Sequence, residues 1–150
     1  MENFVKLKQF KEVEKFLEKE NFFNAEVGKY IKIKRECFDD LVIEKIGEDE
    51  YSISLYYRHP SGDSLREPEI TFLVKPYKEK RTFIPISYTL DSMGLYHNLN
   101  CELSTKDDMP IFVNLGGDLR AIEGVFYNLK LYNNLFKNLD KYDIQIIRGD

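Results

Sequence analysis

The segment HPSGDSLREPEI, residues 59–70, holds the side chains of this sequence that are best suited to chemistry. It contains one histidine and three carboxylates, namely His59, Asp63, Glu67 and Glu69. Because residues two apart on a strand share a face, Glu67 and Glu69 could bind a hard cation or act as an acid and a base. The segment also has turn chemistry, since Gly62 tolerates a positive φ and Asp63 can accept backbone amides. Three interpretations stay open: a structural turn, a metal or catalytic site, and a loop that recognises a partner.

The structural turn is the interpretation that the sequence favours. No triad of metal ligands with a reliable spacing appears, and the only other histidine, His97, lies far along the chain. The hydrophobic runs on either side of the segment predict strands, so the chain needs a connection at this point. We therefore expect Asp63 to accept backbone amides within residues 61–66.

The alternation of apolar residues constrains how those two strands pair. The odd residues of 51–57 must oppose the even residues of 70–74, because both sets carry the apolar face. One pairing sets Tyr57 opposite Ile70, which brings Arg58 beside Glu69. The other sets Tyr57 opposite Pro68, which brings Tyr56 beside Glu69. Either pairing gives Glu69 a cross-strand partner on the second face of the sheet.

The wider chain has the pattern of a single α+β domain over residues 1–150. Spacings of three and four predict an N-terminal helix over 3–20 and a long C-terminal helix over 119–139, for which Asp118 is a candidate N-cap. Strands are predicted at 29–34, 40–46, 51–57, 69–75 and 83–90, with a short sixth strand within 95–103. The short connections predict a mostly antiparallel sheet of five to six strands, with the C-terminal helix packed on one face through Ile122, Phe126, Leu129 and Phe136. Residues 143–149 form either a closing strand or a loose end.

Composition excludes several classes of protein. A net charge of −4 argues against a nonspecific nucleic-acid coat, which binds by neutralising phosphates. Cys37 and Cys101 are too few for a disulfide scaffold and lack metal-ligand spacing, as expected of thiols in a reducing cytosol. No stretch has the roughly 18 consecutive apolar residues that cross a bilayer, and the first residues lack the apolar core of a signal peptide. We expect a soluble cytoplasmic protein without a membrane partner.

A basic run at residues 75–81, KPYKEKR, interleaves a tyrosine with cations. Its cations are Lys75, Lys78, Lys80 and Arg81. Such a run can bind single-stranded nucleic acid by stacking and phosphate pairing. A solvated hairpin tip that discourages edge pairing is the favoured interpretation.

Several motifs together resemble an uncharacterised bacterial family found mainly on phages, plasmids and integrative elements. The shared pattern is a Gly-Asp step, Pro-Glu entering a strand, a Pro-x-Ser-Tyr strand, an Asp-x-x-Gly-x-Tyr turn and a late Phe-x-Asn-Leu helix. The matching residues are Tyr57, Gly62, Asp63, Pro68, Glu69, Pro85, Ser87, Tyr88, Asp91, Gly94, Tyr96, Phe136, Asn138 and Leu139. Where that family has His, Asn, Asp and Trp, this chain has Tyr56, Ser61, Glu67 and Leu135. The resemblance implies a domain of unknown function in a mobile-element setting rather than a particular reaction.

Our leading hypothesis is a small non-enzymatic protein that binds and regulates another protein, encoded by the host or by the element. Inhibition of host defence is one form that such a role could take. Tyrosine is enriched at protein interfaces, and the expected binding residues are His59, Asp63, Glu67, Glu69, Tyr56, Tyr88, Asp91 and Tyr96. One alternative is a metal-dependent hydrolase that uses Asp63, Glu67 and Glu69. A second is single-strand nucleic-acid binding through residues 75–81. No cofactor is expected, and the oligomeric state stays open.

Overall fold

The computed structural model describes residues 4–6, 10–36, 38–77, 80–106, 108–113 and 119–149, and for residues 4–6, 77 and 80 it describes the backbone alone. The strands are β1 (Phe4–Lys6), β2 (Tyr30–Arg35), β3 (Asp40–Lys45), β4 (Glu50–Arg58), β5 (Ser64–Tyr77), β6 (Lys80–Leu90), β7 (Leu95–Asn98), β8 (Cys101–Leu103), β9 (Pro110–Val113) and β10 (Ile144–Gly149). The α-helices are α1 (Lys11–Lys19) and α2 (Leu119–Lys137), and short 3-10 turns lie at η1 (Phe22–Asn24), η2 (Asp91–Met93) and η3 (Leu139–Lys141).

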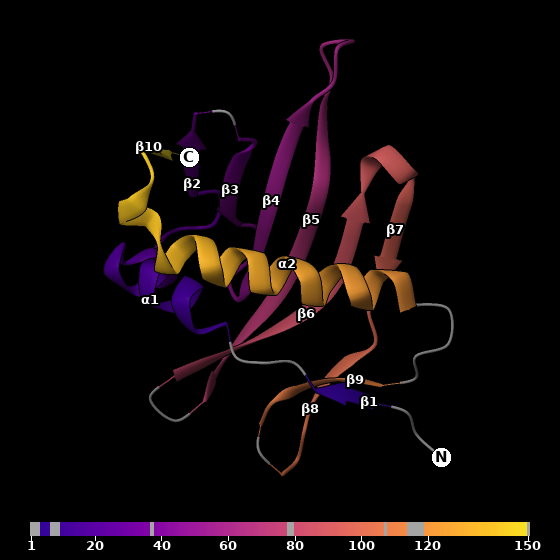
Figure 1. Ribbon diagram of the computed structural model, residues 1–150. Coiled ribbons are helices and arrows are strands. Elements are labelled where there is room, and N and C mark those ends of the chain that lie inside the picture. The colour runs from indigo at the N-terminus through magenta and orange to yellow at the C-terminus, as the bar shows by residue number, and fades with distance from the viewer. Residues whose placement is uncertain are drawn as a thin grey trace.

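The strands form two antiparallel sheets. The larger sheet has seven strands in the order β10-β2-β3-β4-β5-β6-β7, and the smaller has three in the order β1-β9-β8. Both helices cross one face of the larger sheet, and the β4–β5 hairpin projects beyond them (Figure 1). The expected α+β class is confirmed, with an N-terminal helix, a large antiparallel sheet and a long C-terminal helix. The sheet is larger than expected because residues 144–149 pair with β2 as an edge strand.

The core lies between the helices and the covered face of the larger sheet. Residues of one parity on β2, β3, β4 and β5 are almost fully buried there, and they include Ile33, Leu41, Ile43, Ile53, Ile70 and Phe72. Phe10 packs its ring against Phe72 and Phe83, with ring centroids 5.5 and 5.4 Å apart. These alternating apolar residues bury one face of the sheet, as the period of two requires.

The N-terminal segment departs from the predicted helix over 3–20. The α-helix begins only at Lys11, and Phe4–Lys6 instead form a strand that pairs with β9, Phe4 lying opposite Val113. The helical spacing of the early apolar residues is overridden by pairing with a strand more than a hundred residues away. The candidate cap Asp118 lies outside the described residues.

The register of the β4–β5 hairpin keeps the expected parity but neither expected partner of Glu69. Ile53 lies opposite Ile70 and Ser54 opposite Glu69, so the pairings with Arg58 or Tyr56 were wrong. The strands continue toward the tip past a bulge, where Glu67 and Pro68 together oppose the single residue Leu55. Pro68 cannot donate to a ladder, and a bulge is a place in a sheet where proline is tolerated.

Pro85 also lies beside a bulge. Thr71 pairs with Ser87 and Phe72 with Pro85, so Ile86 is the extra residue of β6. The predicted strand over 95–103 is divided between the two sheets. β7 extends the larger sheet, and β8 joins the smaller one.

Helix α2 packs on the core largely as its periodicity predicts. Ile122, Leu129 and Phe136 are buried, whereas Phe126 is only partly buried and packs its ring on Phe112 of the smaller sheet, at 5.9 Å. Gly124 lies against Tyr88 of β6, and a Cβ at that glycine would meet the tyrosine ring at 2.5 Å. No described helix has the length and apolar character needed to cross a membrane.

We predict that Gly124→Ala lowers the free energy of unfolding by about 1–2 kcal/mol, because the added methyl group overpacks a buried ring. Helix propensity alone would change stability by about 1 kcal/mol in the opposite direction. Thermal or denaturant unfolding measures the sign, and Glu123→Ala on the exposed side of the helix is the matched control. In a Tyr88→Leu background Gly124→Ala should become neutral or stabilising. Stabilisation of the wild type by Gly124→Ala would contradict this packing.

Candidate functional site

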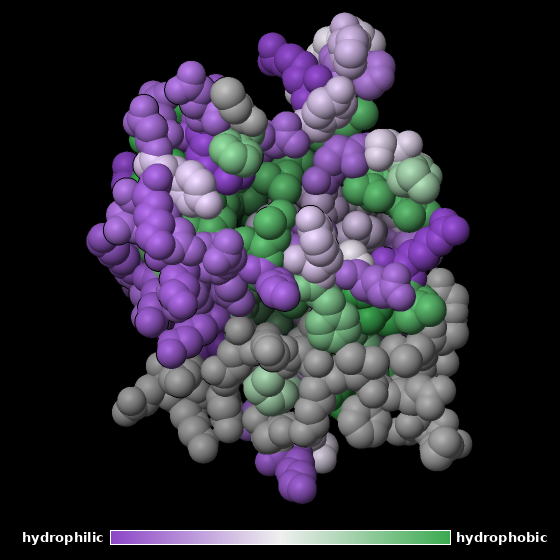
Figure 2. Space-filling model, in the orientation of Figure 1, coloured by the Kyte–Doolittle hydropathy of each residue, from purple (hydrophilic) through white to green (hydrophobic). Residues whose placement is uncertain are grey.

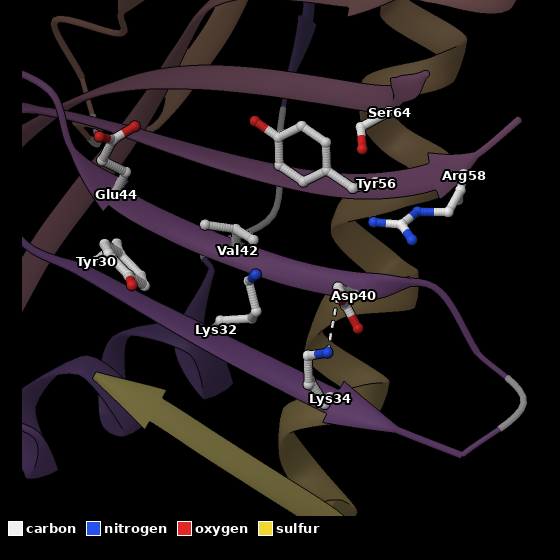
Figure 3. Close-up of a pocket in the computed structure, with 9 residues that line it drawn as sticks. All are labelled: Tyr30, Lys32, Lys34, Asp40, Val42, Glu44, Tyr56, Arg58 and Ser64. Carbon is white, nitrogen blue, oxygen red and sulfur yellow. Dashed lines mark ion pairs between the residues drawn. The ribbon is translucent and has the colours of Figure 1, made fainter. Parts of the chain in front are cut away.

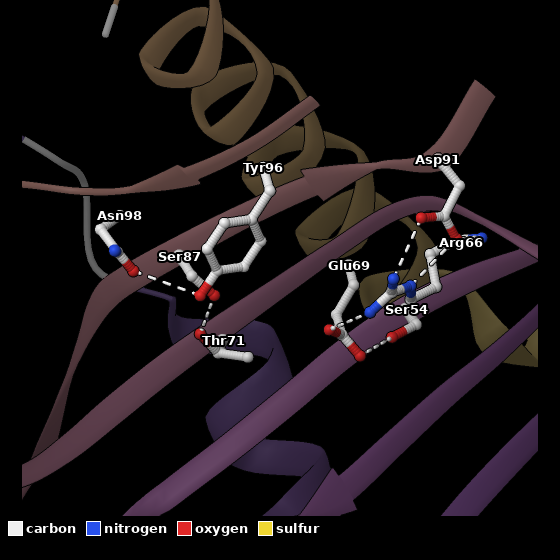
Figure 4. A network of polar contacts seen from close by, with 8 residues as sticks. All are labelled: Ser54, Arg66, Glu69, Thr71, Ser87, Asp91, Tyr96 and Asn98. Atoms are coloured by element: carbon white, nitrogen blue, oxygen red, sulfur yellow. Dashed lines mark hydrogen bonds and ion pairs between the residues drawn. The ribbon is translucent and has the colours of Figure 1, made fainter. Parts of the chain in front are cut away.

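The larger sheet has a second face that neither helix covers. The side chains on this open face follow from the strand registers, because residues directly opposite each other point to the same side. One row across the sheet is Lys32, Val42, Ser54, Glu69, Thr89 and Tyr96. The next row is Tyr30, Glu44, Ser52, Thr71, Ser87 and Asn98. Both helices lie behind the strands when this face is viewed directly (Figure 4).

A hollow of about 500 Å³ occupies the β2–β4 side of the open face. Its lining residues, labelled in Figure 3, are Tyr30, Lys32, Lys34, Asp40, Val42, Glu44, Tyr56, Arg58 and Ser64. Lys34 pairs with Asp40 at 3.7 Å. No hydrogen bond or ion pair of the Lys32 or Arg58 side chain is found within the described part of the chain. Two aromatic rings, and two cations with no partner among the described residues, therefore border an open depression.

On the β5–β7 side of the open face, Arg66 organises a polar network (Figure 4). Its guanidinium donates to both carboxylate oxygens of Asp91 at 3.0 Å, and its backbone N–H donates to the same carboxylate at 2.7 Å. Arg66 also pairs with Glu69 at 3.4 Å, and Glu69 accepts a bond from the Ser54 hydroxyl at 3.2 Å. The hydrogen bonds from Arg66 hold the pKa of Asp91 below its ordinary value.

Glu67 makes a second link between β5 and the turn η2. Its carboxylate accepts the backbone N–H of Ser92 at 2.8 Å and the hydroxyl of that residue at 2.9 Å. Together with the Arg66–Asp91 pair, this contact fastens the β6–β7 turn onto β5. Of the carboxylates expected as acid, base or metal ligands, Glu67 is thus the one that contacts this turn.

At the hairpin tip, the predicted turn forms with different donors and acceptors. Gly62 has φ of 97°, and its N–H donates to the carbonyl of His59 at 2.8 Å. The expectation that Asp63 accepts backbone amides was wrong, because within the described part of the chain its carboxylate accepts only the Ser61 hydroxyl, at 3.3 Å. The His59 ring takes that role instead, accepting the Ser61 N–H at 3.1 Å. An imidazole can reach two residues ahead much as an aspartate does.

A family model described as "Domain of unknown function (DUF6908)" matches residues 11–113, more than half of the chain. The chain belongs to the DUF6908 family. No curated protein and no solved structure matches it. The DUF6908 match runs from the start of α1 to the end of β9, so it spans β2–β7, which carry the hollow and the polar network. The expected membership of an uncharacterised domain family is confirmed.

In this DUF6908 chain, the residues expected to bind a partner fall into separate places. Glu67, Glu69 and Asp91 gather around Arg66 and η2, and Tyr56 borders the hollow. His59 and Asp63 lie at the exposed hairpin tip. Tyr96 is 63% exposed on the edge strand β7, whereas Tyr88 is buried beneath α2. No group of three or more His, Cys, Asp or Glu residues suited to a metal ion occurs among the described residues.

Two cations of the basic run have partners among the described residues. Lys75 pairs with Asp49 at 3.8 Å, and Arg81 pairs with Glu18 of α1 at 2.8 Å while its guanidinium stacks on Phe23 at 3.9 Å. Lys78 and the side chain of Lys80 lie outside the described residues.

The sequence pattern did not single out the residues that line the hollow on β2, nor Arg66, which organises the polar network. Tyr30, Lys32 and Lys34 alternate with the core residues Ile31 and Ile33, so the pattern KYIKIK already placed them on one face. That face was recognisable from the alternation, but its being open was not, because the layer that covers a sheet is set by helices elsewhere in the chain.

We predict that Asp91→Asn lowers the free energy of unfolding by about 1–2 kcal/mol at neutral pH, as the loss of a charge-assisted bond does. Because its folded-state pKa is depressed, Asp91 contributes stability above its unfolded pKa and loses it as pH falls through the folded pKa. The difference between wild type and variant should therefore shrink on acidification below about pH 4. Denaturant unfolding across pH measures it. Asp63→Asn at the tip is the control and should change stability by less than about 0.5 kcal/mol. An equal loss in both variants, or a gap independent of pH, would contradict the role of the Arg66–Asp91 pair.

Proposed function

We propose that this chain is a non-enzymatic binding protein that docks another protein on the open face of its larger sheet. The observation that carries the proposal is the hollow between Tyr30 and Tyr56, with Lys32 and Arg58 unpaired at its border among the described residues. Tyrosine and arginine are the residue types that interface centres favour. Unpaired cations beside them would meet carboxylates of the partner.

The contacts of the carboxylates support a binding role over the metal-dependent hydrolase. Glu67 accepts hydrogen bonds from Ser92, and Glu69 accepts them from Arg66 and Ser54, so each would have to give up these bonds to bind a cation. Asp63 lies apart from both, at the hairpin tip. Burial raises the pKa of the Cys101 thiol to about 12, which keeps it protonated and a poor nucleophile.

The mixture of charges on the open face supports a protein partner over single-stranded nucleic acid. Asp40 and Glu44 border the same hollow as Lys32 and Arg58, and carboxylates repel phosphates. The net charge of −4 also disfavours binding to the phosphates of a nucleic acid. Interspersed charges of both signs, in contrast, are what complementary protein surfaces use to select one partner.

The mobile-element setting, a cytoplasmic location and inhibition of a host-defence protein are part of the proposal. Their support is the motif resemblance, with its Gly-Asp and Pro-Glu steps, and the cysteine usage. Genomic context tests the setting: genes of this family should lie beside phage or integration genes. A consistent location among housekeeping genes would contradict it.

Affinity capture from bacterial lysate tests the binding face. We expect wild-type protein to retain a stoichiometric partner, and Lys32→Glu with Arg58→Glu to retain at least about tenfold less, because the charge complementarity is reversed. Lys19→Glu with Lys106→Glu is the matched control, since it reverses two exposed cations away from the open face. Recovery of no stoichiometric partner, or equal recovery by the reversed variant, would refute the proposal.

Two further measurements separate the alternatives. Calorimetry with Mg²⁺, Mn²⁺ and Zn²⁺ should show no binding, whereas binding lost in Glu67→Gln and Glu69→Gln would favour the hydrolase. Gel shifts with single-stranded oligonucleotides should show no retention at low salt. Retention with a steep salt dependence would favour nucleic-acid binding.

A further inference from the structure

A small cleft lies on the other side of the molecule, where the β2–β3 turn meets the C-terminal half of α2. It encloses about 250 Å³, and its walls include Arg35, Phe38, Leu131 and Tyr142. Phe38, Leu131 and Tyr142 are 56%, 41% and 36% exposed, which is high for large apolar and aromatic side chains that lie together. The cleft is therefore an apolar depression that the fold itself leaves unfilled.

Arg35 gives this cleft a charged donor without an acceptor. Its guanidinium lies 4.4 Å from the ring centre of Phe38 and 5.8 Å from that of Tyr142. The Nε atom is buried and has no hydrogen-bond acceptor in the described part of the chain. Because Nε is closed to solvent, an incoming oxygen would instead meet the terminal N–H groups, which also have no acceptor among the described residues and belong to the same guanidinium. A carboxylate suits it best, because it accepts in the plane of the guanidinium.

The cleft continues into a shallower groove along the outer side of α2. The two hollows share Leu131 and Asn134, and the groove holds about 570 Å³ beside Tyr127, which is 68% exposed. Hydrophobic side chains gather in the middle of this side of the molecule, with hydrophilic ones toward α1 (Figure 2). The cleft and the groove together form a path with an apolar floor that runs from Tyr127 to Phe38.

The charges beside this path are mainly positive. Lys11, Lys130 and Lys137 border the groove and Arg35 the cleft, against the acidic residues Glu12 and Asp39. Glu12 already pairs with Lys15, at 3.9 Å. A cationic border on a chain of net charge −4 is a local concentration that favours an acidic occupant.

We propose that this α2 groove binds an acidic segment of a partner protein. The segment places one large apolar side chain among Phe38, Leu131 and Tyr142 and a neighbouring carboxylate on Arg35. The lysines along α2 meet its further acidic residues. This surface lies on the helix-covered side of the sheet and is separate from the open face.

Selection from a random peptide display library tests the proposal, with wild-type protein as the target. We expect the selected peptides to carry a large apolar residue flanked by Asp or Glu. Fluorescence anisotropy with a winning peptide should show binding at least about tenfold weaker in Leu131→Asp and in Arg35→Gln, as hot-spot residues give. Binding to the wild type should weaken as salt rises, and Arg35→Gln should reduce that dependence.

The controls distinguish this groove from the rest of the surface. Tyr96→Ala on the open face should leave peptide affinity unchanged, and unchanged melting temperatures should show that the groove variants are folded. Of the two groove variants, Leu131→Asp should disturb folding less than Arg35→Gln, because the leucine side chain is already exposed. The proposal would be overturned if the selected peptides were neutral or basic, or if no peptide were enriched. Loss of peptide binding in Tyr96→Ala would also overturn it. A dimer of the wild type that Leu131→Asp dissociates would also overturn it, since the occupant would then be a second copy of the chain.

Discussion

The pairing of Ile53 with Ile70, and of Ile70 with Tyr88, sets which face of the larger sheet is apolar. Because side chains alternate along a strand, a slip of one residue in the pairing would turn these residues toward solvent. The apolar face on which α1 and α2 pack would then be lost. The helices in turn cover only that face, which leaves Tyr30, Lys32 and Tyr56 on the other. Both the core and the candidate site therefore depend on one register through β4, β5 and β6.

Polar contacts on the open face secure the register where the strands are irregular. The bulge at Glu67 and Pro68 interrupts the β4–β5 ladder, and beside it Arg66 joins Asp91 and Glu69 while Glu67 holds Ser92. A bulge loses backbone pairing, and charge-assisted side-chain bonds compensate at the same place. Glu67 and Glu69 thus take part in contacts that link β4, β5 and η2 beside the bulge.

The helix-covered side of the molecule presents a different surface. There the exposed rings of Phe38 and Tyr142 and the side chain of Leu131 surround Arg35, and lysines of α1 and α2 lie along the groove. The open face is polar with charges of both signs, whereas the α2 groove has an apolar floor with a positive border. Two surfaces of such different chemistry on opposite sides of one sheet suit two different occupants.

The sequence by itself determined the local elements, because period and turn chemistry are short-range properties. The alternation of Ile31 and Ile33 with Lys32, the glycine at the hairpin tip and the spacing of α2 all appear in the structure as expected. Only the tertiary structure decided the strand at Phe4–Lys6, the partner of Glu69 and the salt bridge between Arg66 and Asp91. Each of these joins segments whose separation is set by bulges and by distant strands. A one-dimensional pattern carries parity but not register, so it could place Tyr56 and Lys32 on a face without showing that the face is open.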